Sequence, residues 1–201
     1  MKIDAHQHFW NYNIQEYGWI DDSMAILQKD HLPDDLAIIL KSNGFDGSVA
    51  VQARQTLEET KWLLDFSEKH DIVKGVVGWL DVRSNKLDEQ LEMFGNHANL
   101  VGVRHVVQGE PNDRFILGKE FMRGIEKLLG YNLAYDILIF PKQLDASIEF
   151  VKNFPEHRFV LDHIAKPLIK DGVMEPWRTD IRALAERGNV TCKLSGMVTE
   201  A

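Results

Sequence analysis

The hydrophobic positions of this chain fall into short runs that are separated by longer amphipathic stretches. Seven runs rich in β-branched and aromatic residues span 2–5, 47–52, 73–80, 100–107, 133–139, 158–164 and 190–195. Several of them are almost continuously apolar, which is typical of strands buried on both faces of a parallel sheet. We therefore predict seven strands joined by crossover connections.

The stretches between these runs have the periodicity of amphipathic helices. The stretch 33–44 begins with a proline and two acidic residues and ends at a glycine, which are start and stop signals of a helix. The stretch 56–70 opens with a capping-box pattern formed by Thr56 and Glu59. Similar patterns predict helices over 113–130, 141–154 and 175–188. This alternation predicts an α/β fold, and the spacing alone leaves open a TIM-type barrel or a doubly wound sheet.

Composition and charge narrow the class of protein. The 201 residues are 44% hydrophobic and 27% charged, as expected for one globular domain spanning 1–201. The formal net charge of −8 argues against a nucleic-acid partner. No apolar run approaches the roughly 20 residues of a membrane span, and the first residues lack the pattern of a signal peptide. The single cysteine, Cys192, fits a reducing compartment, so we expect a cytoplasmic location.

Polar residues gather at the ends of the predicted strands, where a barrel of this type carries its chemistry. His6 and His8 share one face of the first strand, so their imidazoles could hold one zinc-like ion, although a bare His-x-His is a weak signal. The loop after this strand is long and aromatic, which is typical of a substrate pocket. The other polar residues at strand ends are Gln52, Arg54, Arg104, His105, Gln108, Asp136, Asp162, His163, Lys166, Lys193 and Ser195.

Four stretches together carry a resemblance to a known family. They read IDAHQHFW (3–10), GVRHVVQ (102–108), VLDHIAKP (160–167) and CKLSGM (192–197). Their order and spacing resemble the amidohydrolase superfamily, specifically its amidohydrolase-2 branch and the group of sugar lactonases that includes the L-fuconolactonases and L-rhamnono-lactonases. The resemblance implies a TIM-type (β/α)8 barrel of the metal-dependent hydrolase kind, which opens a sugar lactone by attack of water on the ring ester.

The resemblance also implies roles for particular side chains. His6, His8 and His163 correspond to the metal-binding histidines, and His163 could instead polarise the substrate or position water. Arg104 and His105, with His163, are the expected catalytic residues, suited to the lactone carbonyl or its carboxylate product. The expected cofactor is one divalent metal, zinc first, although metal-independent catalysis stays open. The expected substrate-binding residues are Trp10, Trp19, Gln52, Arg54, Asp136 and Lys166. Plain packing is an equal alternative for the two tryptophans, and a structural role is an equal alternative for Lys166.

The chain departs from the family pattern at two positions. The fifth strand lacks the lysine or histidine ligand of metal-binding members and has Asp136 nearby, and the aspartate of the family's eighth strand would lie beyond Ala201. We therefore expect a barrel of seven strands with a C-terminal truncation and uncertain activity. Two other functions stay open: a metal-dependent decarboxylase or hydratase of the same superfamily, and a non-catalytic barrel that binds only a ligand or partner. The expected partner is a small sugar lactone, and a homo-oligomer is also open.

Overall fold

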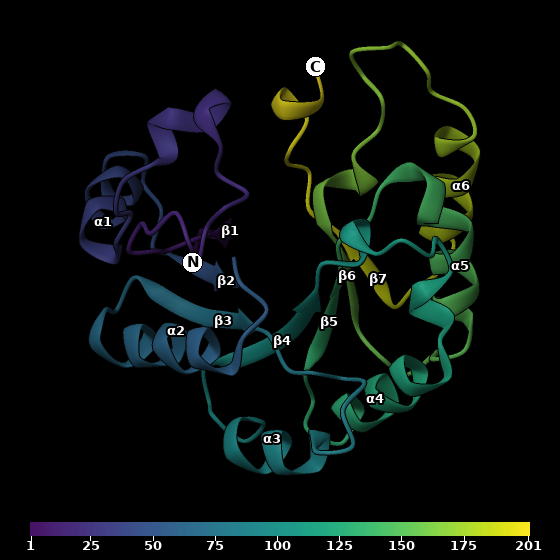
Figure 1. Cartoon of the computed structure of the whole chain (residues 1–201), viewed down its shortest axis with the longest axis horizontal. Coiled ribbons are helices and arrows are strands. Elements are labelled where there is room, and N and C mark those ends of the chain that lie inside the picture. The colour runs from purple at the N-terminus through teal and green to yellow at the C-terminus, as the bar shows by residue number, and fades with distance from the viewer. The chain divides into compact units, whose positions relative to one another are not determined.

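Parallel strands and helices alternate along the chain in the computed structural model, which describes all 201 residues (Figure 1). The strands are β1 (Ile3–Gln7), β2 (Gly47–Val51), β3 (Val73–Gly78), β4 (Leu100–His105), β5 (Ala134–Ile137), β6 (Phe159–Leu161) and β7 (Val190–Cys192). The α-helices are α1 (Pro33–Ser42), α2 (Leu57–Lys69), α3 (Leu87–Phe94), α4 (Lys119–Leu129), α5 (Leu144–Lys152) and α6 (Trp177–Ala185). Short 3-10 turns occupy Asp22–Leu27, Val107–Gly109, Phe115–Leu117, Pro141–Gln143, Asp162–Ala165 and Val198–Glu200.

The chain divides into two compact units. The first unit comprises Met1–Trp79 and His97–Val101, and the second comprises Leu80–Asn96 and Gly102–Ala201. Strand β4 begins in the first unit and continues in the second. None of the helices combines the length and apolar character that a membrane span needs.

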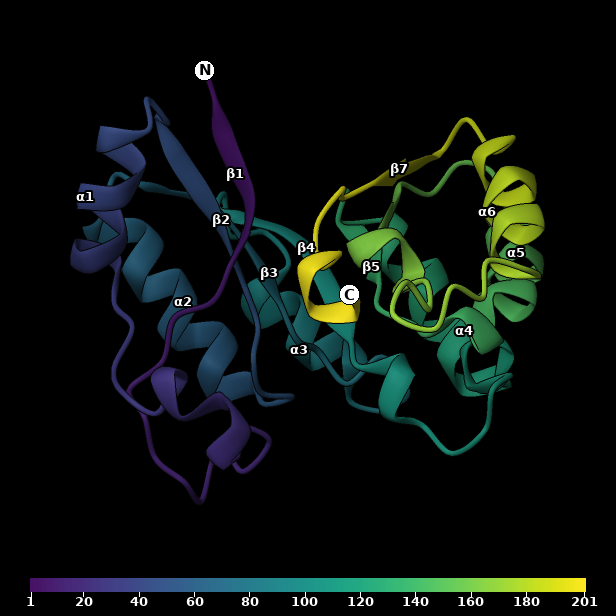
Figure 2. The same cartoon turned by 90° about the horizontal axis from the view of Figure 1, so that it is seen from above.

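In the first unit, β2 pairs in parallel with β1 on one side and with β3 on the other. Helix α2 packs along β3 (Figure 2). This helix starts where predicted because the Thr56 hydroxyl accepts a hydrogen bond from the Glu59 N–H at 3.1 Å. The register of β1 shifts between Asp4 and Gln7, so the strand is irregular where its first histidine lies. The buried aliphatic residues include Ala50, Val51, Leu63, Leu64, Val76 and Val77.

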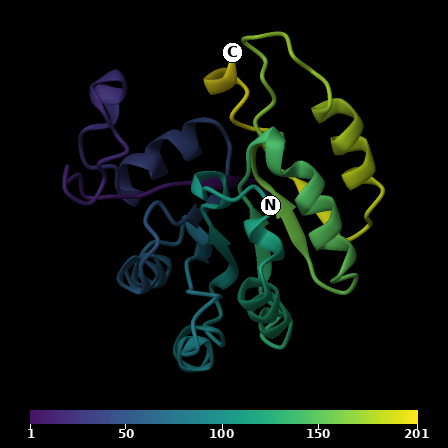
Figure 3. The same cartoon turned by 45° about the vertical axis from the view of Figure 1, so that its right-hand side comes forward.

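In the second unit, parallel pairing joins β4 to β5, β5 to β6, and β6 to β7. Helices α5 and α6 lie side by side, as the green and yellow-green helices of Figure 3 show. The core contains a group of rings in edge-to-face contact, a geometry that aromatic pairs prefer. Phe121, Tyr135, Phe150 and Phe159 form this group. The register places Arg104 beside Asp136, which brings two predicted site residues onto neighbouring strands.

All seven predicted strands are present, but some element boundaries were wrong. The strand predicted over 158–164 ends at Leu161, because the chain turns sharply at the next residues. The helix predicted over 113–130 begins only at Lys119, because Gly118 has an extended backbone and separates it from a short 3-10 turn. Helix α3 was not predicted at all, although its buried face of Leu87, Leu91 and Phe94 is amphipathic.

Candidate functional site

The first feature of the candidate site is a pair of imidazoles, one from His6 in β1 and one from His8 just after it. His6 Nε2 lies 3.2 Å from His8 Nε2, and the two rings meet edge to face. On the other side of its ring, His8 Nδ1 lies 2.7 Å from the carbonyl oxygen of Val51 in the neighbouring strand. Because a carbonyl oxygen can only accept, Nδ1 of His8 carries the hydrogen and Nε2 carries the lone pair. The lone pair on His8 Nε2 therefore points toward the His6 ring.

This pair fits two ligands of a single zinc ion. Zinc–nitrogen bonds of about 2.0–2.1 Å with a tetrahedral angle place two ligand nitrogens about 3.3 Å apart. The observed separation of 3.2 Å between the two Nε2 atoms agrees with that value. In addition, a metal-binding histidine commonly donates its other N–H to a carbonyl, as His8 does to Val51. The donor set and its orientation therefore suit a divalent metal.

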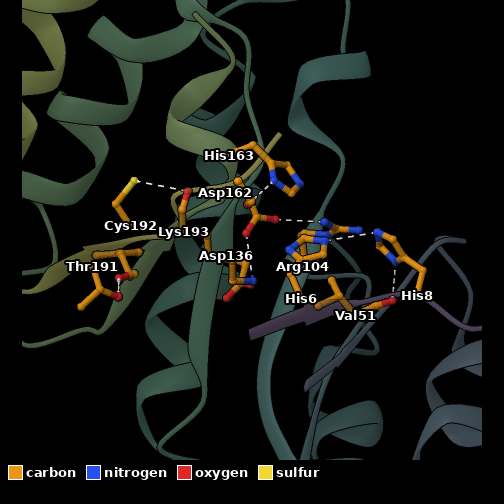
Figure 4. Close-up of polar contacts among 12 residues, drawn as sticks. His6, His8, Val51, Arg104, Asp136, Asp162, His163, Thr191, Cys192 and Lys193 are labelled. Carbon is orange, nitrogen blue, oxygen red and sulfur yellow. Dashed lines mark hydrogen bonds and ion pairs between the residues drawn. The ribbon is translucent and has the colours of Figure 1, made fainter. Parts of the chain in front are cut away.

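The second feature is a buried array of alternating charges in the second unit. Arg104 NH1 lies 2.9 Å from Asp162 Oδ2, and Lys193 Nζ lies 2.9 Å from Asp162 Oδ1. Lys193 Nζ also lies 2.5 Å from Asp136 Oδ2. Figure 4 shows the Asp162 carboxylate between the two cations. None of the four side chains is more than 10% exposed, so each charge depends on its neighbours to offset the cost of burial.

The carboxyl group of Asp136 holds its proton more tightly than an ordinary aspartate. Burial, with a further contribution from the Asp162 charge, raises the pKa of Asp136 from 3.8 to about 6. The Lys193 ammonium acts in the opposite direction but does not cancel these two effects. Asp136 therefore changes charge near neutral pH, which is the range in which acid–base groups of enzymes operate.

His163 and Lys166 follow β6 in a turn of unusual backbone conformation. His163 Nδ1 lies 2.7 Å from the hydroxyl oxygen of Ser195. The Lys166 ammonium lies 5.3 Å from the centre of the Phe140 ring, and burial lowers the pKa of Lys166. Ser195 is the residue here to which sequence analysis gave no role, although it was noted at the end of its strand.

His105 does not join the charged array. Successive side chains of a strand point to opposite faces, so His105 lies on the other side of β4 from Arg104. Its Nε2 is 2.7 Å from Glu110 Oε1, and its ring stacks on Phe115 at 5.1 Å. An adjoining depression of about 300 Å³ is lined by Arg83, Glu110, Pro111, Asn112, Phe115, Gly118, Glu120 and Phe121. The structure thus pairs His105 with Glu110 and stacks it on Phe115, and its catalytic role stays a prediction.

The two tryptophans of the long loop after β1 differ in their exposure. Trp10 is 5% exposed and donates its indole N–H to the Lys29 carbonyl at 2.8 Å. It forms a small core with Tyr17 and Ile20, so the packing interpretation describes it. Trp19 is 47% exposed and meets the Trp10 ring edge on. Of the two rings, Trp19 is the more accessible.

Gln52 and Arg54 follow β2, and neither side chain is fully exposed. Gln52 is fully buried, and Arg54 NH1 is 2.7 Å from Glu16 in the long loop. The Arg54 guanidinium also lies 5.3 Å from the Tyr17 ring. Burial raises the pKa of Tyr17 to about 12, so its hydroxyl stays protonated. Arg54 therefore connects the loop to the strand end, a role that was not predicted.

Glu59 was missed as a residue that shapes the site. Its side chain is fully buried, and its Oε2 accepts hydrogen bonds from the N–H groups of Ala53 and Arg54 at 3.1 and 2.6 Å. Instead of completing the capping box at Thr56, the carboxylate orders the segment that follows β2. The capping pattern gave the helix start but no signal for this second contact.

Comparison with known proteins reveals relatives along the whole chain. The family model for amidohydrolases matches residues 3–201. The L-fucono-1,5-lactonase of Burkholderia multivorans is 38% identical over 207 residues, covering 100% of this chain and 70% of that protein. The L-fucono-1,5-lactonase of Burkholderia ambifaria is 35% identical and is covered to 69% by the whole of this chain.

Solved structures agree with these relatives. The crystal structure of an amidohydrolase from Burkholderia multivorans with bound zinc matches with a TM-score of 0.95 and 38% identity, covering 100% of this chain and 72% of that one. An amidohydrolase 2 from Bifidobacterium longum subsp. infantis matches in fold, with a TM-score of 0.75, 23% identity and coverage of 97% and 73%. The predicted α/β fold of the TIM-barrel amidohydrolases, with seven strands in this chain, is confirmed.

Proposed function

Because this chain belongs to the amidohydrolase-2 family, we propose that it is a hydrolase that opens a sugar lactone by attack of water on the ring ester. The observation that carries the proposal is the pair of convergent His6 and His8 Nε2 atoms in a chain related over its whole length to two L-fucono-1,5-lactonases. The relatives support the substrate class, and the imidazole pair supports hydrolytic chemistry.

A divalent metal, with zinc as the first candidate, is the proposed cofactor. His6 and His8 would hold it through their Nε2 atoms, and the family resemblance adds His163 as a third ligand. The zinc bound in the Burkholderia multivorans amidohydrolase favours the same metal here. When bound, such an ion supplies Lewis-acid polarisation of a carbonyl and lowers the pKa of water.

The charged residues supply the remaining electrostatics. Negative charge develops on the carbonyl oxygen as water attacks, and a preorganised cation stabilises it. Arg104 is the proposed cation, and Asp162 holds its guanidinium in place through the 2.9 Å contact. The Lys193 ammonium pairs with the second carboxylate oxygen of Asp162. The negative charge of Asp162 is therefore shared between two cations, and it neutralises only part of the charge of Arg104. Lys166 and Trp19 are the proposed contacts to hydroxyl groups and to a sugar face.

An assay with a pH indicator across a panel of aldonolactones, including L-fucono-1,5-lactone, tests this function. We expect acid release from at least one lactone, and we expect Arg104→Lys to lower kcat at least tenfold, since a point charge replaces the planar fork. Arg187→Lys, at a distant loop of the second unit, is the matched control. If the folded protein binds zinc but releases acid from no lactone, the proposal is contradicted and a decarboxylase or hydratase is favoured. If the protein neither binds zinc nor hydrolyses a lactone, a non-catalytic binding protein is favoured.

A further inference from the structure

The segment that carries His163 has four consecutive non-glycine residues in the left-handed region. Their φ angles are +52° for His163, +47° for Ile164, +56° for Ala165 and +48° for Lys166. Such a run is uncommon because the Cβ of an L-residue crowds the following carbonyl oxygen in this conformation. Backbone of this kind persists only where surrounding contacts determine it, and it is concentrated at functional sites.

Neighbouring elements hold this turn in place. The Lys166 N–H donates to the His163 carbonyl at 2.8 Å, which closes the turn. The indole N–H of Trp177, the first residue of α6, donates to the Ile164 carbonyl at 2.7 Å. Ala165, the third residue of the turn, is fully buried. The backbone of His163 is therefore fixed by contacts from a different helix rather than by local sequence preference.

The imidazole of His163 is fixed separately, by two residues that follow β7. Ser195 Oγ lies 2.7 Å from His163 Nδ1. Gly196 packs its backbone against the same ring: a Cβ on Gly196 would lie 2.8 Å from His163 Cβ, 3.1 Å from Cγ and 3.3 Å from Nδ1. Its φ of +73° also favours glycine. A side chain at this position would push the imidazole away.

We propose that Ser195 and Gly196 are positioning residues that set the orientation and tautomer of His163. A hydroxyl can donate or accept, and we assign the accepting role to Ser195 Oγ, because the proposed use of Nε2 as a ligand requires the hydrogen on Nδ1. A neutral imidazole has one donor and one acceptor nitrogen, so a hydrogen on Nδ1 leaves Nε2 as the acceptor. Gly196 keeps the ring close enough for this hydrogen bond. The inference deepens the proposed function, because it prepares His163 to bind a metal or a substrate through Nε2.

The tautomer of His163 can be measured without substrate or metal. In ¹⁵N-labelled, metal-free protein, two-bond ¹H–¹⁵N spectra distinguish the two neutral tautomers, and loss of signals in His163→Gln assigns the ring. We expect the Nδ1–H form in the native protein and in Ser195→Thr, which keeps the hydroxyl. Ser195→Ala should shift the population to the Nε2–H form or to a mixture, whereas the signals of the buried His157 should not move.

Activity gives a second readout, which is separable from the first. If the lactonase proposal holds, Ser195→Ala should lower kcat by about 10- to 100-fold, the usual cost of removing a partner behind a functional histidine, and Ser195→Thr should recover most of it. A native Nε2–H form, or an unchanged tautomer in Ser195→Ala, would overturn the positioning role whatever the activity. Absence of lactone hydrolysis with the expected tautomers would instead overturn the proposed function and leave the positioning role standing.

Discussion

The Nζ atom of Lys193 lies 2.9 Å from Oδ1 of Asp162, so a residue that follows β7 neutralises a fully buried carboxylate at the end of β6. The same ammonium contacts Asp136 of β5. One lysine thus connects polar groups of three strands, and its removal would leave two carboxylates sharing the single cation of Arg104.

We predict that Lys193→Met destabilises the protein by about 3 to 5 kcal/mol, because breaking a buried ion pair leaves an uncompensated charge. Urea unfolding followed by tryptophan fluorescence measures this change. Lys193→Arg, which keeps the charge, and Lys170→Met in an exposed loop are the controls. If Lys193→Met lowers the free energy of unfolding by less than about 1 kcal/mol, the two carboxylates do not depend on Lys193 and the prediction is wrong.

The raised pKa of Asp136 makes a pH-dependent contribution to stability. The folded protein holds this proton up to a pKa of about 6, whereas the unfolded chain loses it near 3.8. Between these values the folded state binds more protons, so this contribution is complete below pH 3.8 and falls as the pH rises to 6, by at most about 1.4 kcal/mol per pH unit. Asp136→Asn should remove that slope, and Asp171→Asn at the surface should not. Parallel stability curves for the native protein and Asp136→Asn would contradict the assignment.

His157 contributes with the opposite sign. The ring is only 2% exposed, neither nitrogen has a hydrogen-bond partner, and burial lowers its pKa from 6.5 to about 4. Because the unfolded chain takes up this proton first, the contribution is present above pH 6.5 and is lost as the pH falls to 4. His157→Phe should therefore be less destabilised by acid than the native protein, as denaturant midpoints at pH 7 and pH 5 would reveal. His97→Phe provides a comparison at a more accessible histidine. If His97→Phe reduces the acid destabilisation as much as His157→Phe does, burial of His157 is not the cause of the effect.

Gly124 marks a close approach of α4 to the segment after β3. A Cβ at this position would lie 1.9 Å from the Val82 carbonyl oxygen, a contact that only backbone movement relieves. We predict that Gly124→Ala costs at least about 3 kcal/mol, the upper end of ordinary overpacking, despite the better helix propensity of alanine. Gly188→Ala, where a Cβ would meet nothing within 4 Å, should change stability by less than about 0.5 kcal/mol. Similar unfolding midpoints for the two variants would refute the close approach.

The sequence predicted the elements well because apolar runs and capping signals are local. The same signals could not separate Arg104 from His105: a strand buried on both faces is apolar throughout, so the pattern does not reveal which face each polar residue takes. The turn at His163 contains no glycine, so nothing local predicts its left-handed backbone, which depends on Trp177 in the next helix. Likewise, the role of Gly196 depends on an imidazole 33 positions earlier in the chain. The unpredicted parts are those set by distant contacts.

The imidazole pair at the end of β1, His6 and His8, gives the most direct test of metal binding. We predict that His8→Ala lowers zinc affinity at least about 10-fold, since it removes both a ligand nitrogen and the ring that the Val51 carbonyl orients. His6→Ala should have an effect of the same size, because the two Nε2 atoms at 3.2 Å would share one ion. Titration with zinc against a chromophoric chelator measures each affinity, and His97→Ala reports any loss that follows from removing a surface imidazole. If either His6→Ala or His8→Ala binds zinc as tightly as the native protein, these two nitrogens do not form the metal site.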